Sequence, residues 1–161
     1  MSLKGLSGYI EITKEKYNIL FPEKIKIKVE QKKFREFINL HKDIFLWEEE
    51  TSLGKKTLEE IESFPDRELV LRDLNEFHAY AFYKKDKGYY ALDIVWNPAY
   101  GLISINFNNS RVTIPALEIL LQMANYCDAM LLVRGKKHIT KEFIEKEKLE
   151  INQRKTFKHK S

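Results

Sequence analysis

Few of the residues that usually reveal a function are present in this 161-residue chain. It has one cysteine, Cys127, so an internal disulfide is impossible and a zinc site built from cysteines is not expected. Cys127 ends an apolar helical pattern, which predicts a small buried side chain rather than a reactive thiol. No apolar run approaches the roughly 20 residues that span a bilayer, and the first ten residues lack the apolar core of a secretory signal. We therefore expect a soluble cytoplasmic protein that does not enter a membrane.

Motifs for phosphate binding, nucleophilic catalysis and metal binding are also missing. The chain contains no GxGxxG or Walker loop, no Gly-x-Ser-x-Gly elbow and no His-Glu-x-x-His pair. Its four histidines are scattered, without the spacing of three or four residues that places two metal ligands on one helix face. They are His41, His78, His138 and His159. We expect neither a cofactor nor a metal ion.

The net charge of +4 describes the end of the chain and not its body. Residues 1–150 carry 24 basic and 24 acidic side chains, so the excess lies in residues 151–161. Its basic side chains are Arg154, Lys155, Lys158 and Lys160. A short basic tail gives weak, salt-sensitive attachment to nucleic acid without sequence specificity. We expect this tail to be loose and to follow a single domain formed by residues 1–150.

Charge is nevertheless sorted within the body. Residues 14–35 have a balance of +5 and residues 36–76 a balance of −7. The acidic excess is densest at Glu48, Glu49 and Glu50, directly after Trp47. Clustered acidic side chains are either a solvated face or a surface that attracts a basic partner protein.

The first half of the chain predicts one strand and two helices. Residues 24–29 alternate, with Ile25, Ile27 and Val29 on one face and a row of lysines on the other, which is typical of a half-buried strand. The lysines are Lys24, Lys26 and Lys28. They either protect a sheet edge against aggregation or contact phosphates.

Residues 31–45 predict an amphipathic helix. His41 lies on its apolar side, where one ring nitrogen is expected to bond a backbone carbonyl. Thr57 and Glu60 match a capping box, which predicts a short helix up to Phe64.

The second half predicts an antiparallel meander and two more helices. Strands are expected over 77–84, 89–96 and 102–107, and Gly101 supplies positive φ after the Asn-Pro turn at 97–98. Thr113 caps a nearly buried helix over 114–127, a strand follows over 129–134, and Thr140 caps a charged helix to about Glu150. The fold class is therefore α+β, with a mainly antiparallel sheet of about five strands. The sheet comprises the meander 77–107 and the strands near 24–29 and 129–134.

The meander also predicts a polar and aromatic surface. Tyr90, Leu92, Ile94 and Trp96 alternate toward the core, which leaves Tyr89 and Asp93 on the opposite face. Ser104 and Asn106 of the neighbouring strand are expected beside Asp93. The register of strand 77–84 is left open by the sequence.

A register that brought His78 to this face would add a base to Asp93 and Ser104. These three side chains are the set used by a small hydrolase, although catalysis also needs an oxyanion donor and a pocket that excludes water.

The sequence favours a non-catalytic protein-binding domain. Its candidate surfaces are the segment Trp47 to Glu50 and the polar-aromatic sheet face. Alternatives are weak nucleic-acid binding through the tail and the lysine row, and hydrolysis at the sheet face. An acid-patched α+β domain of this size resembles, in general character only, immunity and antitoxin proteins that cover another protein's active site.

Overall fold

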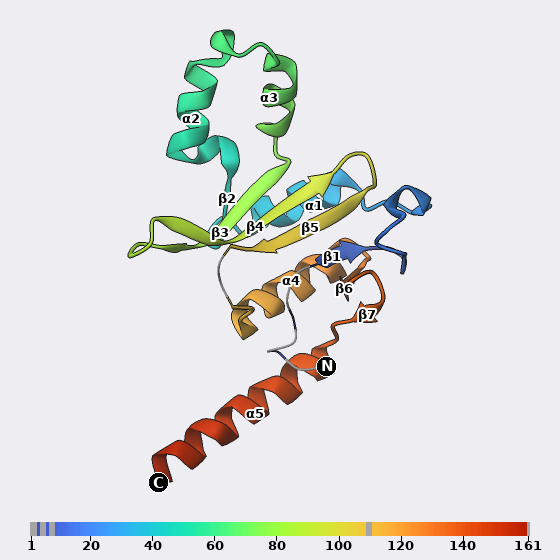
Figure 1. Cartoon of the computed structure of the whole chain (residues 1–161), viewed down its shortest axis with the longest axis vertical. Helices are drawn as coiled ribbons and strands as arrows, with labels where there is room; N and C mark the ends of the chain where they lie inside the picture. Colours follow the sequence, from blue (N-terminus) through green and yellow to red (C-terminus); the bar gives the residue numbers. More distant parts are fainter. Residues whose placement is uncertain (1–2, 4–5, 7–8, 109–110, 161) are drawn as a thin grey trace.

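The computed structural model describes Leu3, Leu6, residues 9–108 and residues 111–160. Residues 159 and 160 are described by their backbone alone. Within these residues the protein is α+β, with a seven-stranded antiparallel sheet in the order β2-β3-β4-β5-β1-β6-β7 (Figure 1). The strands are β1 (Ile10–Thr13), β2 (Phe45–Trp47), β3 (His78–Lys84), β4 (Tyr89–Asn97), β5 (Leu102–Phe107), β6 (Met130–Val133) and β7 (Lys137–His138). The helices are α1 (Gln31–Leu40), α2 (Ser52–Glu59), α3 (Arg67–Asp73), α4 (Ile114–Tyr126) and α5 (Lys141–Lys160), with 3-10 turns η2 (Pro22–Lys24), η3 (Glu48–Glu50) and η4 (Ile61–Ser63). No helix in this described part is long and apolar enough to cross a membrane.

Strands β3, β4 and β5 form the predicted meander. Each pairs antiparallel with the next along the chain. In the turn after β4, the Asn97 carboxamide oxygen accepts the amides of Ala99 and Tyr100, and Gly101 has a φ of 65°. The predicted turn chemistry is confirmed.

Strand β1 lies between β5 and β6, and all four of its residues are buried. It therefore joins the meander to the C-terminal strands. The sheet exceeds the predicted five strands or so because β1 and the short edge strands β2 and β7 are present in addition to the predicted β3, β4, β5 and β6.

The predicted strand over residues 24–29 is wrong. The chain forms η2 and then runs without regular structure to Glu30. The Val29 amide donates to the Gly101 carbonyl, and Trp96 Nε1 donates to the Val29 carbonyl at 2.9 Å. This segment therefore crosses the meander turn and has no neighbouring strand. Ile27 is 55% exposed, so the sequence alternation does not match a buried face.

Helices α1 and α4 cover one face of the sheet (Figure 1). Helix α1 ends at Leu40, earlier than predicted, because the chain turns at His41 toward β2. His41 stacks on Phe37, and its Nδ1 donates to the Phe37 carbonyl at 2.8 Å, which confirms the predicted structural role of this histidine. We call the opposite side of the sheet the outer face.

The caps of the C-terminal helices are confirmed. Thr113 Oγ1 accepts the Ala116 amide at the start of α4, and Thr140 Oγ1 accepts the Phe143 amide at the start of α5. Cys127, which ends α4, is 1% exposed, as predicted. Helix α5 packs its first turns on α4 and continues to Lys160 (Figure 1). The predicted end near Glu150 is wrong, and the segment expected to be loose is helical.

The predicted capping box at Thr57 is also wrong. Helix α2 already begins at Ser52, because the hydroxyl of Thr51 accepts the Gly54 amide at 2.9 Å. Thr57 lies inside the helix, and its hydroxyl donates to the Leu53 carbonyl.

Substituting Gly101 tests whether the irregular segment is held against the meander turn. An added Cβ would lie 2.3 Å from Lys28 Cβ, whereas a Cβ at Gly88, with the similar φ of 73°, would meet nothing within 4 Å. We expect Gly88→Ala to cost about 1 kcal/mol of unfolding free energy from backbone strain alone. Gly101→Ala should cost at least about 1 kcal/mol more from the added clash. Urea unfolding measures both, and equal losses would contradict the close approach.

Candidate functional site

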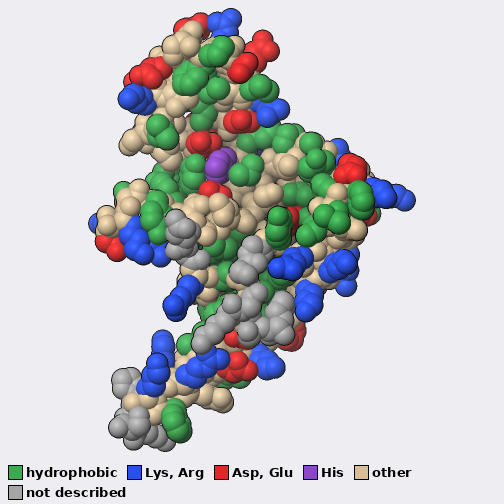
Figure 2. All heavy atoms as spheres, viewed as in Figure 1, with side chains coloured by type: hydrophobic (Ala, Val, Ile, Leu, Met, Phe, Trp, Pro, Cys, Tyr) green, Lys and Arg blue, Asp and Glu red, His purple; other side chains and the backbone are tan. Residues whose placement is uncertain are grey.

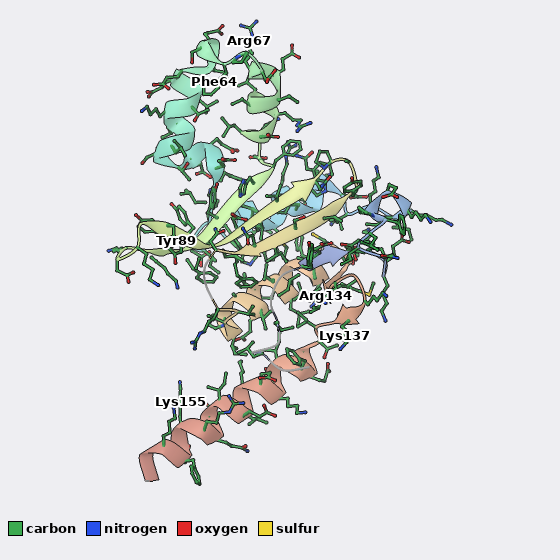
Figure 3. The ribbon with its side chains drawn as sticks, viewed as in Figure 1. Phe64, Arg67, Tyr89, Arg134, Lys137 and Lys155 are labelled. Atoms are coloured by element: carbon green, nitrogen blue, oxygen red, sulfur yellow. The ribbon has the colours of Figure 1, made fainter. Side chains whose placement is uncertain are left out.

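A pair of helices projects from the sheet between β2 and β3 (Figure 1). We call residues 51–74, which include α2 and α3, the helical hairpin. Its only buried residue is Gly54. Phe64 and Arg67 lie at its tip, away from the sheet (Figure 3). The hairpin thus adds surface to the protein and little to its core.

A cleft of about 580 Å³ lies between the helical hairpin and the end of the meander. This volume is in the range of ligand-binding clefts. Just over half of its lining residues are apolar and come from the hairpin, from the start of β3 and from the end of β4 and its turn: Leu53, Val70, Leu74, Phe77, Val95, Trp96, Pro98 and Ala99. Its charged lining residues are Glu48, Arg72, Asp73 and His78.

His78 lies at the foot of this cleft, between two carboxylates. Its Nδ1 is 3.3 Å from Glu48 Oε2, and its Nε2 is 3.7 Å from Asp93 Oδ2. The pairing of His78 with Val95 and of Tyr80 with Asp93 brings all four side chains to the outer face and settles the open register. Figure 2 shows a histidine bordered by acidic side chains where the projecting hairpin meets the sheet.

The two carboxylates determine the charge of His78. Burial lowers the pKa of its imidazole, but hydrogen bonding and attraction to Asp93 and Glu48 outweigh burial and raise the pKa to about 9. His78 is therefore an imidazolium at neutral pH. One positive charge faces two negative ones, which leaves the group with an excess negative charge.

Aromatic rings extend the site along the outer face. The Tyr80 ring lies 4.5 Å from the His78 ring and stacks on Tyr90 at 5.1 Å. Burial, followed by the charges of Glu48 and Asp93, raises the pKa of Tyr80 to about 12, so its hydroxyl stays protonated. Tyr90 was predicted to face the core; it is instead half-buried against Tyr80.

The acidic segment supports the hairpin and is not a free surface. Trp47, predicted to contact a partner, is 3% exposed and its Nε1 donates to Asn39, so its side chain belongs to the core and offers little surface for contact. Glu49 accepts the Glu76 amide, and burial raises the pKa of its carboxyl. Glu50 accepts the Trp47 amide and pairs with Lys42. Of the three glutamates, Glu48 alone lines the cleft.

The remaining members of the predicted sheet surface are only partly brought together. Asp93 pairs with Asn106 across β4 and β5, as expected, and Ser104 lies on the same face beside Val95. Tyr89 lies near the β3–β4 turn, away from the helical hairpin (Figure 3).

The hydrolase set lacks a contact between base and nucleophile. Val95 stands between His78 and Ser104 on the ladder, so their strands are about 10 Å apart. Within the described residues His78 Nε2 has no hydrogen-bond partner, Ser104 included. An imidazolium held by two carboxylates also has no free lone pair with which to accept a proton.

The residues proposed for nucleic-acid binding fall on two separate elements. Lys24 lies over the Phe21 ring of its own segment, and Lys28 donates to the Ala99 carbonyl in the meander turn. Lys26 belongs to the same segment. Arg154, which pairs with Glu150, lies with Lys155 and Lys158 on the last turns of α5 (Figure 3). The side chain of Lys160 is outside the described residues. Binding through these two groups stays a prediction.

Neither a group of metal ligands nor a similar protein identifies the function of this site. Across residues 9–108 and 111–158, no three His, Cys, Asp or Glu side chains are arranged to hold a metal ion. Comparison with protein-family models, with curated proteins and with solved structures found no match.

A buried carboxyl of β1, Glu11, was not singled out from the sequence. It pairs with Ser104 on the outer face and is 9% exposed, and its Oε2 has no hydrogen-bond partner in the described part of the chain. Burial raises its pKa to about 7. Alternation in a strand of uncertain position was the only signal that could have located this group.

Glu11 should make stability fall with rising pH. The folded protein holds the Glu11 proton up to about pH 7, whereas the unfolded chain releases it near the ordinary value of 4.5. Unfolding free energy should therefore decline between these values, by up to about 3 kcal/mol. Glu11→Gln should flatten this part of the profile, as measured by urea unfolding from pH 4.5 to 7.5. Parallel profiles for both proteins would contradict a buried titrating carboxyl.

His78 should act in a higher pH window. Its folded pKa is about 9 against an ordinary 6.5, so its stabilising charge is fully present below pH 6.5 and is lost as the pH rises through 9. We expect NMR titration of the His78 ring to give a pKa near 9, and Asp93→Asn to lower it by more than half a unit. A ring that titrates near 6.5 in the wild-type protein would show that the ion contacts do not form.

Proposed function

We propose that this protein is a non-catalytic protein-binding domain that binds a basic partner protein through the helical hairpin and the cleft at its base. The observation that carries the proposal is the exposure of apolar side chains on an acidic projection. Each of these two properties has a separate physical consequence for binding.

The apolar side chains supply the contact area. Leu53 is 73% exposed, Leu69 is 52% exposed and Leu71 is 44% exposed. These leucines come from α2 and α3, two short helices that leave them exposed. Exposed apolar groups within a polar surround are used as contact area in protein interfaces. A partner that covered these leucines would bury apolar surface, and this burial would stabilise the complex.

The charge supplies the selectivity. Residues 48–76 carry ten acidic and four basic side chains. A surface with this excess attracts basic partners and repels acidic ones, which raises the association rate for the former. Asp93 and Ser104 extend the polar part of this surface along the outer face. Such a surface is suited to covering a basic site on another protein, as an inhibitor does.

Capture of a partner by matched variants tests this function. The tagged full chain would be incubated with extract of its native cell at low and high salt, with nuclease treatment, and the retained proteins identified by mass spectrometry. We compare the wild-type chain with Leu69→Ser and with Leu149→Ser on α5, a leucine of similar exposure at 62%.

The proposal expects a basic protein that is retained by the wild type and by Leu149→Ser and reduced at least tenfold by Leu69→Ser. Circular dichroism checks that both variants fold. Equal retention by all three proteins would contradict a role for the hairpin. Retention that disappears with nuclease, together with RNA binding that needs residues 151–161, would instead support nucleic-acid binding.

A further inference from the structure

Two parts of the chain project from its body at opposite ends of the molecule. One is the end of the helical hairpin, residues 59–68, which runs from the last residue of α2 into α3 and contains Phe64 and Arg67 (Figure 3). The other is the C-terminal half of α5, residues 151–160, which contains Lys155. The two lie far apart along the longest axis of the molecule (Figure 1). They therefore do not meet within one chain.

The charges of these two segments are equal in size and opposite in sign. Residues 59–68 carry five acidic side chains and one basic side chain, whereas residues 151–160 carry four basic side chains and no acidic one. We call the first segment the acidic tip and the second the basic end. Figure 2 shows acidic side chains over the hairpin and basic side chains along α5.

Most of the charge of the acidic tip is left without a partner inside the chain. Every residue of the tip is described, and its one ion pair joins Glu62 to Arg67. Four other carboxylates are exposed to solvent: Glu59, Glu60, Asp66 and Glu68. The tip therefore presents four negative charges to a surface that approaches it.

Both projections also expose apolar side chains beside their charges. Leu69, which follows the tip, is 52% exposed, and Phe157 in the basic end is 78% exposed. Phe157 follows Arg154 by three residues, so the two side chains are neighbours on the helix surface. Each projection thus combines apolar contact area with charge of one sign, as protein interfaces do.

The basic end has little support from the body of the protein. Lys148 pairs with Glu118 of α4 at 3.1 Å, and no described residue of α5 after Glu147 is buried. Isolated helices shorter than about 12 residues are marginally stable in water. A surface that covers this half of α5 would therefore stabilise it.

We infer that the acidic tip of one copy of this chain binds the basic end of a second copy. The chain is itself a basic protein, and its net charge of +4 resides in residues 151–161, so it has the charge that the proposed function requires of a partner. The inference rests on the proposed function because it uses the same hairpin. It goes further in naming the partner and in assigning a second binding surface, on α5.

The positions of the two segments favour a closed pair. Two copies that lie side by side in opposite directions make the contact twice, which gives a dimer with two-fold symmetry. Contacts between two acidic tips or between two basic ends are disfavoured by like charge, so copies that lie in the same direction do not pair.

Sedimentation velocity of the purified, nuclease-treated full chain measures the self-association. At low salt, the average mass should rise with concentration above the 19.2 kDa of one chain. It should return to that value at about 1 M salt, where charges are screened beyond about 3 Å. A chain that stays monomeric at low salt up to about 1 mM would overturn the inference, and so would association that salt does not weaken.

Paired charge variants identify the two surfaces. Glu59→Lys with Glu60→Lys brings the net charge of the tip to zero, and Arg154→Glu with Lys155→Glu does the same for the basic end. Each variant alone should self-associate at least about tenfold more weakly than the wild type. An equimolar mixture should associate again, because the first variant keeps a wild-type basic end and the second a wild-type tip. A mixture as weak as each variant alone would overturn the assignment.

A matched control separates these contacts from a general effect of net charge. Lys85→Glu with Lys87→Glu changes the net charge as much as the basic-end variant, at exposed positions on the β3–β4 turn. It should leave self-association unchanged, and an equal loss would contradict a defined interface. Circular dichroism checks that α5 stays helical in every variant.

A substitution without a change of charge covers the case in which the basic-end variant does not fold. Phe157→Ser should weaken self-association at least about fivefold. Leu20→Ser, at a residue 75% exposed in the irregular segment before α1, should leave it unchanged. Unchanged association in folded Phe157→Ser would overturn the role of the basic end.

Capture from the native cell distinguishes this inference from the proposed function. A chain that is monomeric but still retains another basic protein, lost with Leu69→Ser, would overturn the contact between copies and leave hairpin binding standing. Restored association in the mixture of variants, without any other hairpin-dependent protein in the capture, would support the contact between copies. It would overturn a role in covering a site on a different protein.

Discussion

The pairing of β1 on both of its edges is the contact on which the rest of the sheet depends. Ile10, Glu11 and Ile12 pair with both β5 and β6, and all four residues of β1 are buried. Without this strand, the meander and the C-terminal strands would be two separate sheets with unpaired edges, and the apolar side of α4 would have no continuous surface to cover.

Local signals in the sequence predicted the elements that local contacts stabilise. The meander turns and the caps at Thr113 and Thr140 depend on residues a few positions apart, and they are where the sequence places them. The alternation of apolar and basic residues over 24–29 gave a wrong prediction because a strand needs a neighbouring strand to pair with. This segment bonds instead to the turn at Gly101. Both Thr51 and Thr57 are residues that can cap a helix after β2. The helix begins after Thr51 because the Thr51 hydroxyl accepts the Gly54 amide.

The sequence identified the residues of the site but did not predict that they lie together. Glu48, His78 and Asp93 were each identified from the sequence, but for two different surfaces and a catalytic alternative. They meet because β2 pairs with β3 and β3 with β4, and register between strands is poorly encoded by short apolar patterns. The same pairings bury Trp47, whose place beside three glutamates suggested exposure. An imidazole placed between two carboxylates has its pKa raised to about 9 and is charged at neutral pH, which removes the free base that the catalytic alternative required.

The helical hairpin enters and leaves through β2 and β3, which pair with each other directly from Phe45 with Ala81 to Trp47 with Ala79. The segment between these strands is therefore an excursion from the sheet, and the hydrogen bonds between β2 and β3 hold its two ends side by side. Its length and composition can therefore change without shifting the register of the sheet or reopening the core. The sheet and the core would therefore remain the same if the excursion were replaced by a segment of different length and surface.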